Sequence, residues 1–180
     1  MPRIILTYGL ISGLVIITGI IGTIVLAGDE PHGNVWLGYL IMLLALSSIL
    51  VGVKQHRDQA LGGVIRFRTA LGVGLGIAVI AAIAYIVVWE AYLALTDYGF
   101  MDQYIAHTLE AKRAAGVTGA AYQQALAEAE TMRRQYANPL FRVPITFAEI
   151  FPVGLLIALV SAALLRNPRF LPARSRPTAA

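Results

Sequence analysis

The sequence predicts an all-α, polytopic membrane protein with four transmembrane helices and a helical hairpin between the third and the fourth. The first observation is four apolar segments that can each cross a hydrocarbon core, which takes about 20 residues of helix. These segments are residues 4–27, 35–53, 69–95 and 145–165. The second is composition, because 58% of the residues are hydrophobic and 13% are charged. The third is that basic residues gather in only some of the intervening segments.

Helices rather than strands are expected in the apolar segments. Lipid offers no hydrogen-bonding partner, so each crossing segment must satisfy its own backbone groups, and a barrel would show alternating segments of about ten residues. The sequence has no such alternation. Residues 1–180 are therefore expected to form a single membrane domain.

The charges predict an orientation. If the chain crosses four times, one side of the membrane receives nine basic residues and only Asp58 to offset them. The nine are Arg3, Lys54, Arg57, Arg66, Arg68, Arg166, Arg169, Arg174 and Arg176. Most acidic residues, Asp29 and Glu30 among them, fall on the other side. The positive-inside rule then predicts that both termini lie in the cytoplasm, together with a basic loop at 54–68 and a basic tail at 166–180.

The first two spans carry small residues at helical spacing. Gly19 shares a stripe of the first span with Ser12, and Gly38, Ala45 and Gly52 recur every seven residues in the second. Small residues let helix backbones approach closely in a membrane. Glycine is also common in transmembrane helices generally, so chance placement explains the pattern as well.

The predicted cytoplasmic loop at 54–68 is the most distinctive short segment. Gly62-Gly63 permits a tight turn. The basic residues of the loop are Lys54, Arg57, Arg66 and Arg68. Four cations around Phe67 could bind the phosphate of an anionic lipid headgroup, although the positive-inside bias alone also accounts for them. Because these cations lie next to membrane spans, lipid rather than nucleic acid is the expected partner.

In the third span, glycine and a carboxylate share one predicted face. At 100° per residue Gly72, Gly76 and Glu90 point in nearly the same direction, whereas Gly74 points almost the opposite way. We expect Gly72 and Gly76 to pack against another helix and Glu90 to point into the bundle. Glu90 is then either a wetted group at the membrane interface or part of a proton or cation path.

The segment at 97–140 is too polar to span a membrane and is patterned as two helices. Apolar residues follow helical spacing before and after Gly116, which is a typical helix stop, and Asn138-Pro139 ends the second stretch. We expect an extracytoplasmic helical hairpin. Its apolar stripes would cover the mouth of the bundle, the membrane interface or a second subunit.

The last span carries a second carboxylate between two prolines. Pro144 suits the start of a helix, and Pro152 should bend it. Glu149 is expected at a depth similar to that of Glu90, where two carboxylates could share a proton or hold a cation. The alternative is that each carboxylate pairs with Arg142 or with a helix N-terminus.

Catalytic and metal-binding motifs are missing from the sequence. Cysteine is absent, and there is no phosphate-binding loop, zinc-protease helix or nucleophile elbow. His107 and Glu110 have a spacing compatible with metal ligands, and His32 could join them, but solvated surface residues explain all three better. The chain is therefore expected to be no enzyme and to hold neither a cofactor nor a metal.

Three short segments carry a resemblance to a known family. Residues 52–58, which end in Lys54-Gln55-His56-Arg57-Asp58, precede Gly62-Gly63 and Phe67-Arg68-Thr69-Ala70, and residues 136–141 lead into the last span. This arrangement resembles the bacterial membrane family called domain of unknown function 4199. The resemblance implies the same four-span architecture and a location in the bacterial inner (cytoplasmic) membrane. It implies no reaction, cofactor or site residues, because none is assigned to the family.

These observations favour a non-enzymatic membrane protein that packs as a homo-oligomer or with a larger membrane partner. The alternative is a small transporter or lipid-binding protein that uses Glu90 and Glu149 at one end of the bundle and the loop at 54–68 at the other.

Overall fold

The computed structural model describes residues 1–27 and 35–173, and these form seven helices and no strand. The helices are α1 (Pro2–Ala27), α2 (Val35–Leu46), α3 (Ser48–Ala60), α4 (Phe67–Leu95), α5 (Phe100–Ala114), α6 (Gly119–Ala137) and α7 (Pro139–Leu165). The predicted acidic positions Asp29 and Glu30, together with His32, Arg174 and Arg176, lie outside the described residues.

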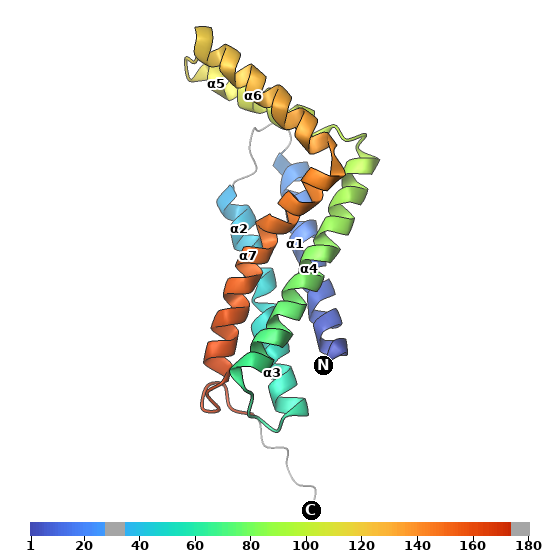
Figure 1. The fold of residues 1–180 in the computed structure, drawn as a ribbon, viewed down its shortest axis with the longest axis vertical. Coiled ribbons are helices and arrows are strands. Elements are labelled where there is room, and N and C mark those ends of the chain that lie inside the picture. Colours follow the sequence, from blue (N-terminus) through green and yellow to red (C-terminus); the bar gives the residue numbers. More distant parts are fainter. Residues whose placement is uncertain (28–34, 174–180) are drawn as a thin grey trace, which may run out of the picture.

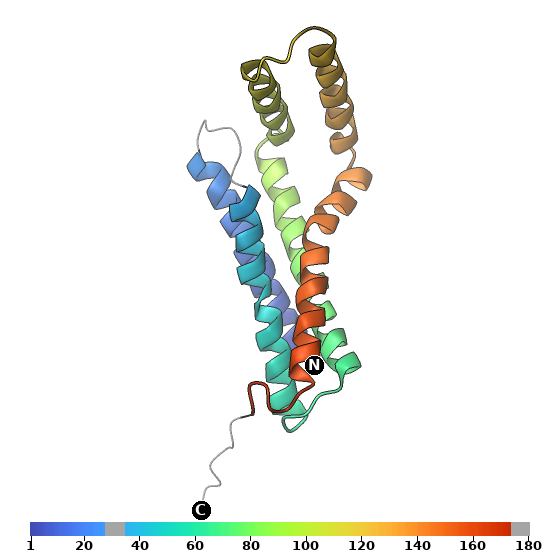
Figure 2. The same cartoon turned by 90° about the vertical axis from the view of Figure 1, so that its left-hand side faces the viewer.

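Four of the segments are long and apolar enough to cross a membrane: Pro2–Thr23, Trp36–Ala60, Phe67–Leu95 and Pro139–Leu165. The second combines α2 and α3, which meet at Ser47. All four run along the long axis of the molecule (Figure 1), and α5 and α6 project beyond one end as a hairpin (Figure 2). The all-α class and the four candidate spans are thereby confirmed.

The ends of two spans differ from the prediction. Residues 54–60 continue α3 as helix, so the connection to α4 is residues 61–66 alone. This extension is stabilised by the ion pair between Lys54 and Asp58, one helical turn apart. The last span begins at Pro139 rather than near residue 145, because the Asn138 side chain caps α7 by accepting a hydrogen bond from the Leu140 backbone N–H at 3.0 Å.

α4 is the central helix, with α1 packed on one side and α7 on the other. The close contacts are made by small residues. A Cβ atom built on Gly13 of α1 would lie 2.7 Å from Ala84 Cβ, and one on Gly154 of α7 would lie 2.7 Å from Ala78 Cβ. Apolar side chains gain little free energy on moving from lipid into a protein interior. Helix association in the bundle therefore depends on dispersion contacts, and these require the backbones to lie close together.

The predicted packing face of α4 was wrong at Gly72. A Cβ atom at Gly72 would meet open space, whereas one at Gly74 would lie 2.9 Å from Ala158 Cβ of α7. Gly76 does pack, because its Cβ would lie 2.9 Å from Ile5 Cδ1 of α1. The prediction assumed that one face of α4 is packed. In the structure α1 and α7 cover two sides of α4, and Gly72 lies on a side that neither covers.

We predict that Gly74→Leu destabilises the protein by about 1–3 kcal/mol, since the added side chain would enter the contact between α4 and α7. The matched variant Gly72→Leu should change stability by less than about 0.5 kcal/mol, because no atom of the described residues outside its own helix lies within 4 Å of a Cβ built there. Thermal unfolding of both variants in one detergent measures the difference. Equal melting temperatures would show that α7 does not pack on this face of α4.

Candidate functional site

The main cluster of polar groups lies where the hairpin joins the bundle. Arg142, in the second turn of α7, has a side chain that is only 2% exposed. Its Nε donates to Glu90 Oε1 of α4 at 2.7 Å and its Nη2 donates to Glu90 Oε2 at 2.6 Å. This two-point geometry is the strongest that a guanidinium makes with a carboxylate. Of the alternatives predicted for Glu90, the structure shows pairing with Arg142.

Further groups enclose the same guanidinium. Its Nη1 donates to the Tyr136 carbonyl oxygen at 2.9 Å, and its Cζ lies 5.3 Å from the centre of the Tyr98 ring and 5.6 Å from that of Tyr136. Tyr98 follows α4 and Tyr136 lies near the end of α6, so one arginine contacts both connections between hairpin and bundle. We call Glu90, Tyr98, Tyr136 and Arg142 the hairpin lock.

Aromatic packing extends the hairpin lock towards the core. Trp89, which is 5% exposed, donates from Nε1 to the Tyr136 hydroxyl at 3.0 Å and stands edge-on to Phe100 of α5 at 4.9 Å between ring centres. Burial raises the pKa of the Tyr136 phenol, which therefore remains a neutral hydrogen-bonding group at physiological pH. The start of α5 and the end of α6 are thus both held against α4.

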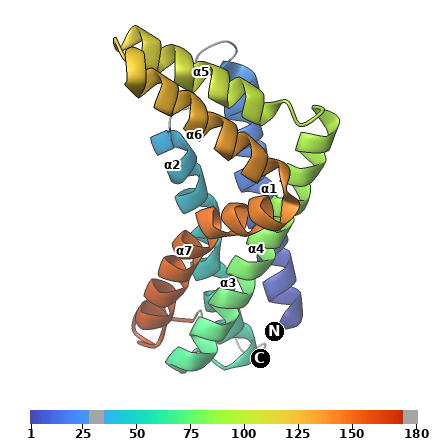
Figure 3. The same cartoon turned by 45° about the horizontal axis from the view of Figure 1, so that its top comes forward.

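Glu149 is not part of this ion pair. It lies seven residues beyond Arg142 on α7, about 10 Å along the helix. Its side chain is exposed and forms no hydrogen bond or ion pair with the residues that the structure describes. α7 itself bends, with its first turns running across α4 at a steep angle to the rest (Figure 3). The cause is Pro144 and Pro152, which remove backbone hydrogen bonds inside the helix.

At the opposite end of the bundle, Arg57 is fully buried and is occupied by the protein itself. Its Nε donates to Asp58 Oδ1 at 2.7 Å, and its Nη1 donates to the Phe170 carbonyl oxygen at 2.9 Å. Its Nη2 donates to the carbonyl oxygen of Leu171. Arg57 is one of the predicted headgroup ligands. In the structure its guanidinium instead holds the turn after α7 against α3. Sequence reasoning missed this role, because carbonyl oxygens more than 100 positions away have no side-chain signature.

The other predicted headgroup ligands differ in their surroundings. Lys54 pairs with Asp58, whereas Arg66 and Arg68 are exposed and make no ion pair within the described part of the chain. Arg166 and Arg169, just after α7, are also exposed at this end. We call Arg66, Arg68, Arg166 and Arg169 the basic end.

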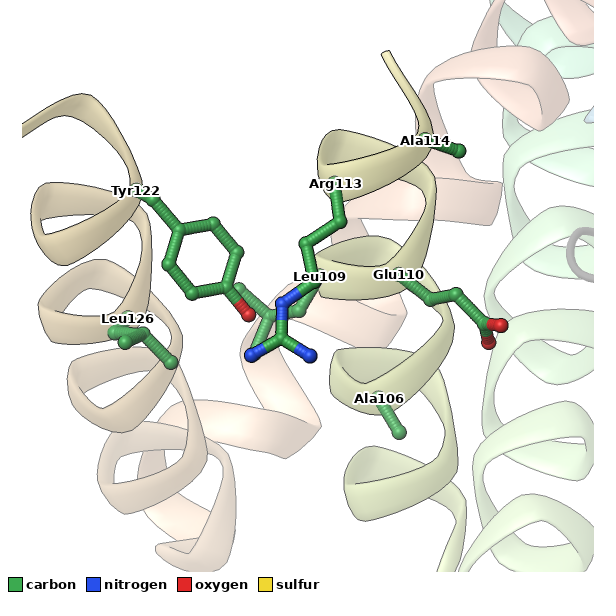
Figure 4. A pocket seen from close by; sticks show the side chains of 7 residues that line it. All are labelled: Ala106, Leu109, Glu110, Arg113, Ala114, Tyr122 and Leu126. Carbon is green, nitrogen blue, oxygen red and sulfur yellow. The ribbon is translucent and has the colours of Figure 1, made fainter. Parts of the chain in front are cut away.

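The hairpin has an open groove between its helices (Figure 4). The Arg113 guanidinium reaches from α5 to lie 4.8 Å from the centre of the Tyr122 ring of α6, and Arg133 Nε lies 2.8 Å from Asp102 Oδ1. Glu110 points away from Tyr122 in this view. Among the described residues, no group of three potential metal ligands includes His107 and Glu110.

We predict that Glu90→Gln lowers the free energy of unfolding by about 2 kcal/mol. The amide cannot neutralise Arg142, and water partly screens the loss because the Glu90 side chain is 28% exposed. Glu110→Gln, an exposed change on the hairpin, should have no measurable effect. Chemical or thermal denaturation of both variants provides the measurement, and a stable Glu90→Gln protein would contradict the importance of the hairpin lock.

The comparisons with known proteins concern the whole of this architecture. The family model described as "Protein of unknown function (DUF4199)" matches residues 7–167, a stretch that includes the hairpin lock, Arg57 and most of all four candidate spans. No curated protein and no solved structure matches the chain. The resemblance noted in the sequence is therefore confirmed, and the chain belongs to the family of proteins of unknown function DUF4199.

Proposed function

We propose that this chain is a non-enzymatic, multi-pass protein of a bacterial inner membrane that presents its hairpin on the extracytoplasmic side. There the hairpin would contact further copies of the chain or another membrane protein. The observation that carries the proposal is the hairpin lock. A buried arginine is costly to desolvate, and here its donors serve to fix both connections of the hairpin to the bundle.

A fixed hairpin suits a role in binding. Rigid surfaces lose less conformational entropy on association than mobile ones, so preorganisation raises affinity. The hairpin also exposes the apolar side chains Tyr104, Leu126 and Met132 beside charged ones. Mixed surfaces of this kind are typical of protein contacts.

The basic end supports the proposed orientation. Arg66 and Arg68, at the start of α4, and Arg166 and Arg169, just after α7, are exposed. α1 begins towards the same end of the bundle at which α4 starts and α7 ends (Figure 1). By the positive-inside rule this end would be cytoplasmic, which would put both termini in the cytoplasm and the hairpin outside.

We predict that a membrane-impermeant thiol reagent added to intact cells labels a cysteine at Ala120, in the hairpin, but not one at Leu61, in the connection before α4. The chain has no native cysteine to interfere. The charge distribution is the physical reason. Labelling of Leu61→Cys alone in intact cells would invert the proposed orientation.

A photo-crosslinking residue at Gln124, which faces out from the hairpin, tests the contact itself. It should yield a discrete cross-linked product, and co-expression of two differently tagged copies would identify self-association. The same residue at Ile83, on the exposed face of α4, is the control for random collision in the lipid. Equal yields at both positions, or none at Gln124, would contradict a contact through the hairpin.

The second candidate function is lipid binding at the basic end, which the exposure of Arg66 and Arg68 favours. Native mass spectrometry of the purified protein should then show anionic lipid that is lost in Arg66→Gln/Arg68→Gln. Arg134→Gln, which removes an exposed cation from the hairpin, should retain it. Retention in the double variant would remove the basis for this function. Transport through Glu90 has less support, because Arg142 occupies both of its oxygens.

A further inference from the structure

Three carboxylates lie within the candidate spans of the described chain, and one of them stands apart. Asp58 is paired with Lys54 and Arg57, and Glu90 is paired with Arg142. Glu149 has no cation within ion-pairing distance among the described residues. It lies ten residues after the start of α7, about 15 Å along the helix, in a candidate span of 27 residues.

The surface around Glu149 is apolar. Ile145, Leu156 and Val160 lie within about 40° of its direction on the helix and are all exposed. In a spanning helix such a face meets hydrocarbon. A carboxylate there would have neither water nor a counter-charge to stabilise it, whereas the protonated acid is neutral.

The groups that face Glu149 from the neighbouring helices are neutral or already paired. Tyr85 of α4 and Tyr136 of α6 lie close enough to interact with it electrostatically. Arg142 and Glu90, the charged groups near Tyr136, neutralise each other. α2 and α3 also pack on α7. α2 contributes no charged residue, and Tyr39 is its titratable side chain. The charged residues of α3 lie at the far end of α7 from Glu149, where Arg57 donates to the carbonyl oxygens of Leu165 and Phe170.

We propose that Glu149 is a proton-binding site within the membrane, a carboxyl group that remains protonated at neutral pH. The neutral acid carries no charge that lipid would have to solvate, and no counter-charge among the described residues would hold it ionised. Neither Arg142 nor Glu90 takes part in holding the proton, because each has its partner. The site is independent of the hairpin's role in binding.

A hydrophobic carbodiimide tests the proposal on the intact protein in liposomes. The acid adds across one C=N bond: its oxygen bonds to the central carbon and its proton passes to nitrogen. Acyl transfer to nitrogen then leaves a stable N-acylurea that carries the mass of one carbodiimide. Because the reaction needs the protonated acid and a reagent dissolved in lipid, it distinguishes Glu149 from ionised carboxylates.

We expect peptide mapping of the wild-type protein at pH 7 to show Glu149 modified at least about tenfold more than Glu90 and Glu110, its internal controls. Modification should decline when the pH is raised to 9. In Glu149→Gln, which retains the size and polarity of the acid, the adduct should be absent, as should the infrared carbonyl band of a protonated carboxyl group. Modification of Glu149 no greater than that of Glu110 would overturn the proposal, and this wild-type comparison decides even if the variant fails to fold.

Discussion

The buried guanidinium of Arg142 is the constraint on which the join between the hairpin and the bundle depends. An arginine cannot give up its charge in a protein, so a buried one must be matched by a counter-charge and by acceptors for its donors. Glu90 supplies the charge and the Tyr136 carbonyl supplies a further acceptor. These requirements fix where α7 starts relative to α4. They also fix the path of the chain into and out of the hairpin.

A second buried arginine constrains the other end of α7 by different chemistry. Arg57 binds Asp58 on its own helix and then backbone carbonyls at Phe170 and Leu171. These two carbonyls lie in the turn after α7, and Nη1 also lies 3.5 Å from the carbonyl oxygen of Leu165, one of the last four of the helix, which have no intrahelical donor. α7 is thus held at its start by an ion pair to α4 and at its end by an arginine from α3. Between these points it is held by contacts of small residues such as Gly154 with Ala78.

Features that depend on one continuous segment of the sequence could be predicted, whereas features that depend on contacts between distant residues could not. The four spans were predictable because length and apolar composition are properties of continuous segments, and the hairpin was predictable from helical periodicity and the stop at Gly116. The pairing of Glu90 with Arg142 was one of several open alternatives, since 52 positions separate them. The predicted packing of Gly72 was wrong because a helical projection assumes that only one side of the helix is covered. The burial of Arg57 could not be foreseen, since charge alone predicts a wet cytoplasmic loop.

The burial of Arg57 also shows why counting charges in the sequence overestimates the number of free cations at this end of the bundle. Positive-inside arguments treat every cation as free to meet water or lipid. Here Arg57 is buried and bonded to other parts of the protein, and Lys54 forms an ion pair with Asp58. Arg66 and Arg68 are exposed and form no ion pair within the described chain. In the proposed orientation, attraction to an anionic membrane surface would therefore come from fewer groups than the sequence contains. Each exposed cation near such a surface contributes about 1 kcal/mol, so the free arginines next to α4 and α7 would supply most of it.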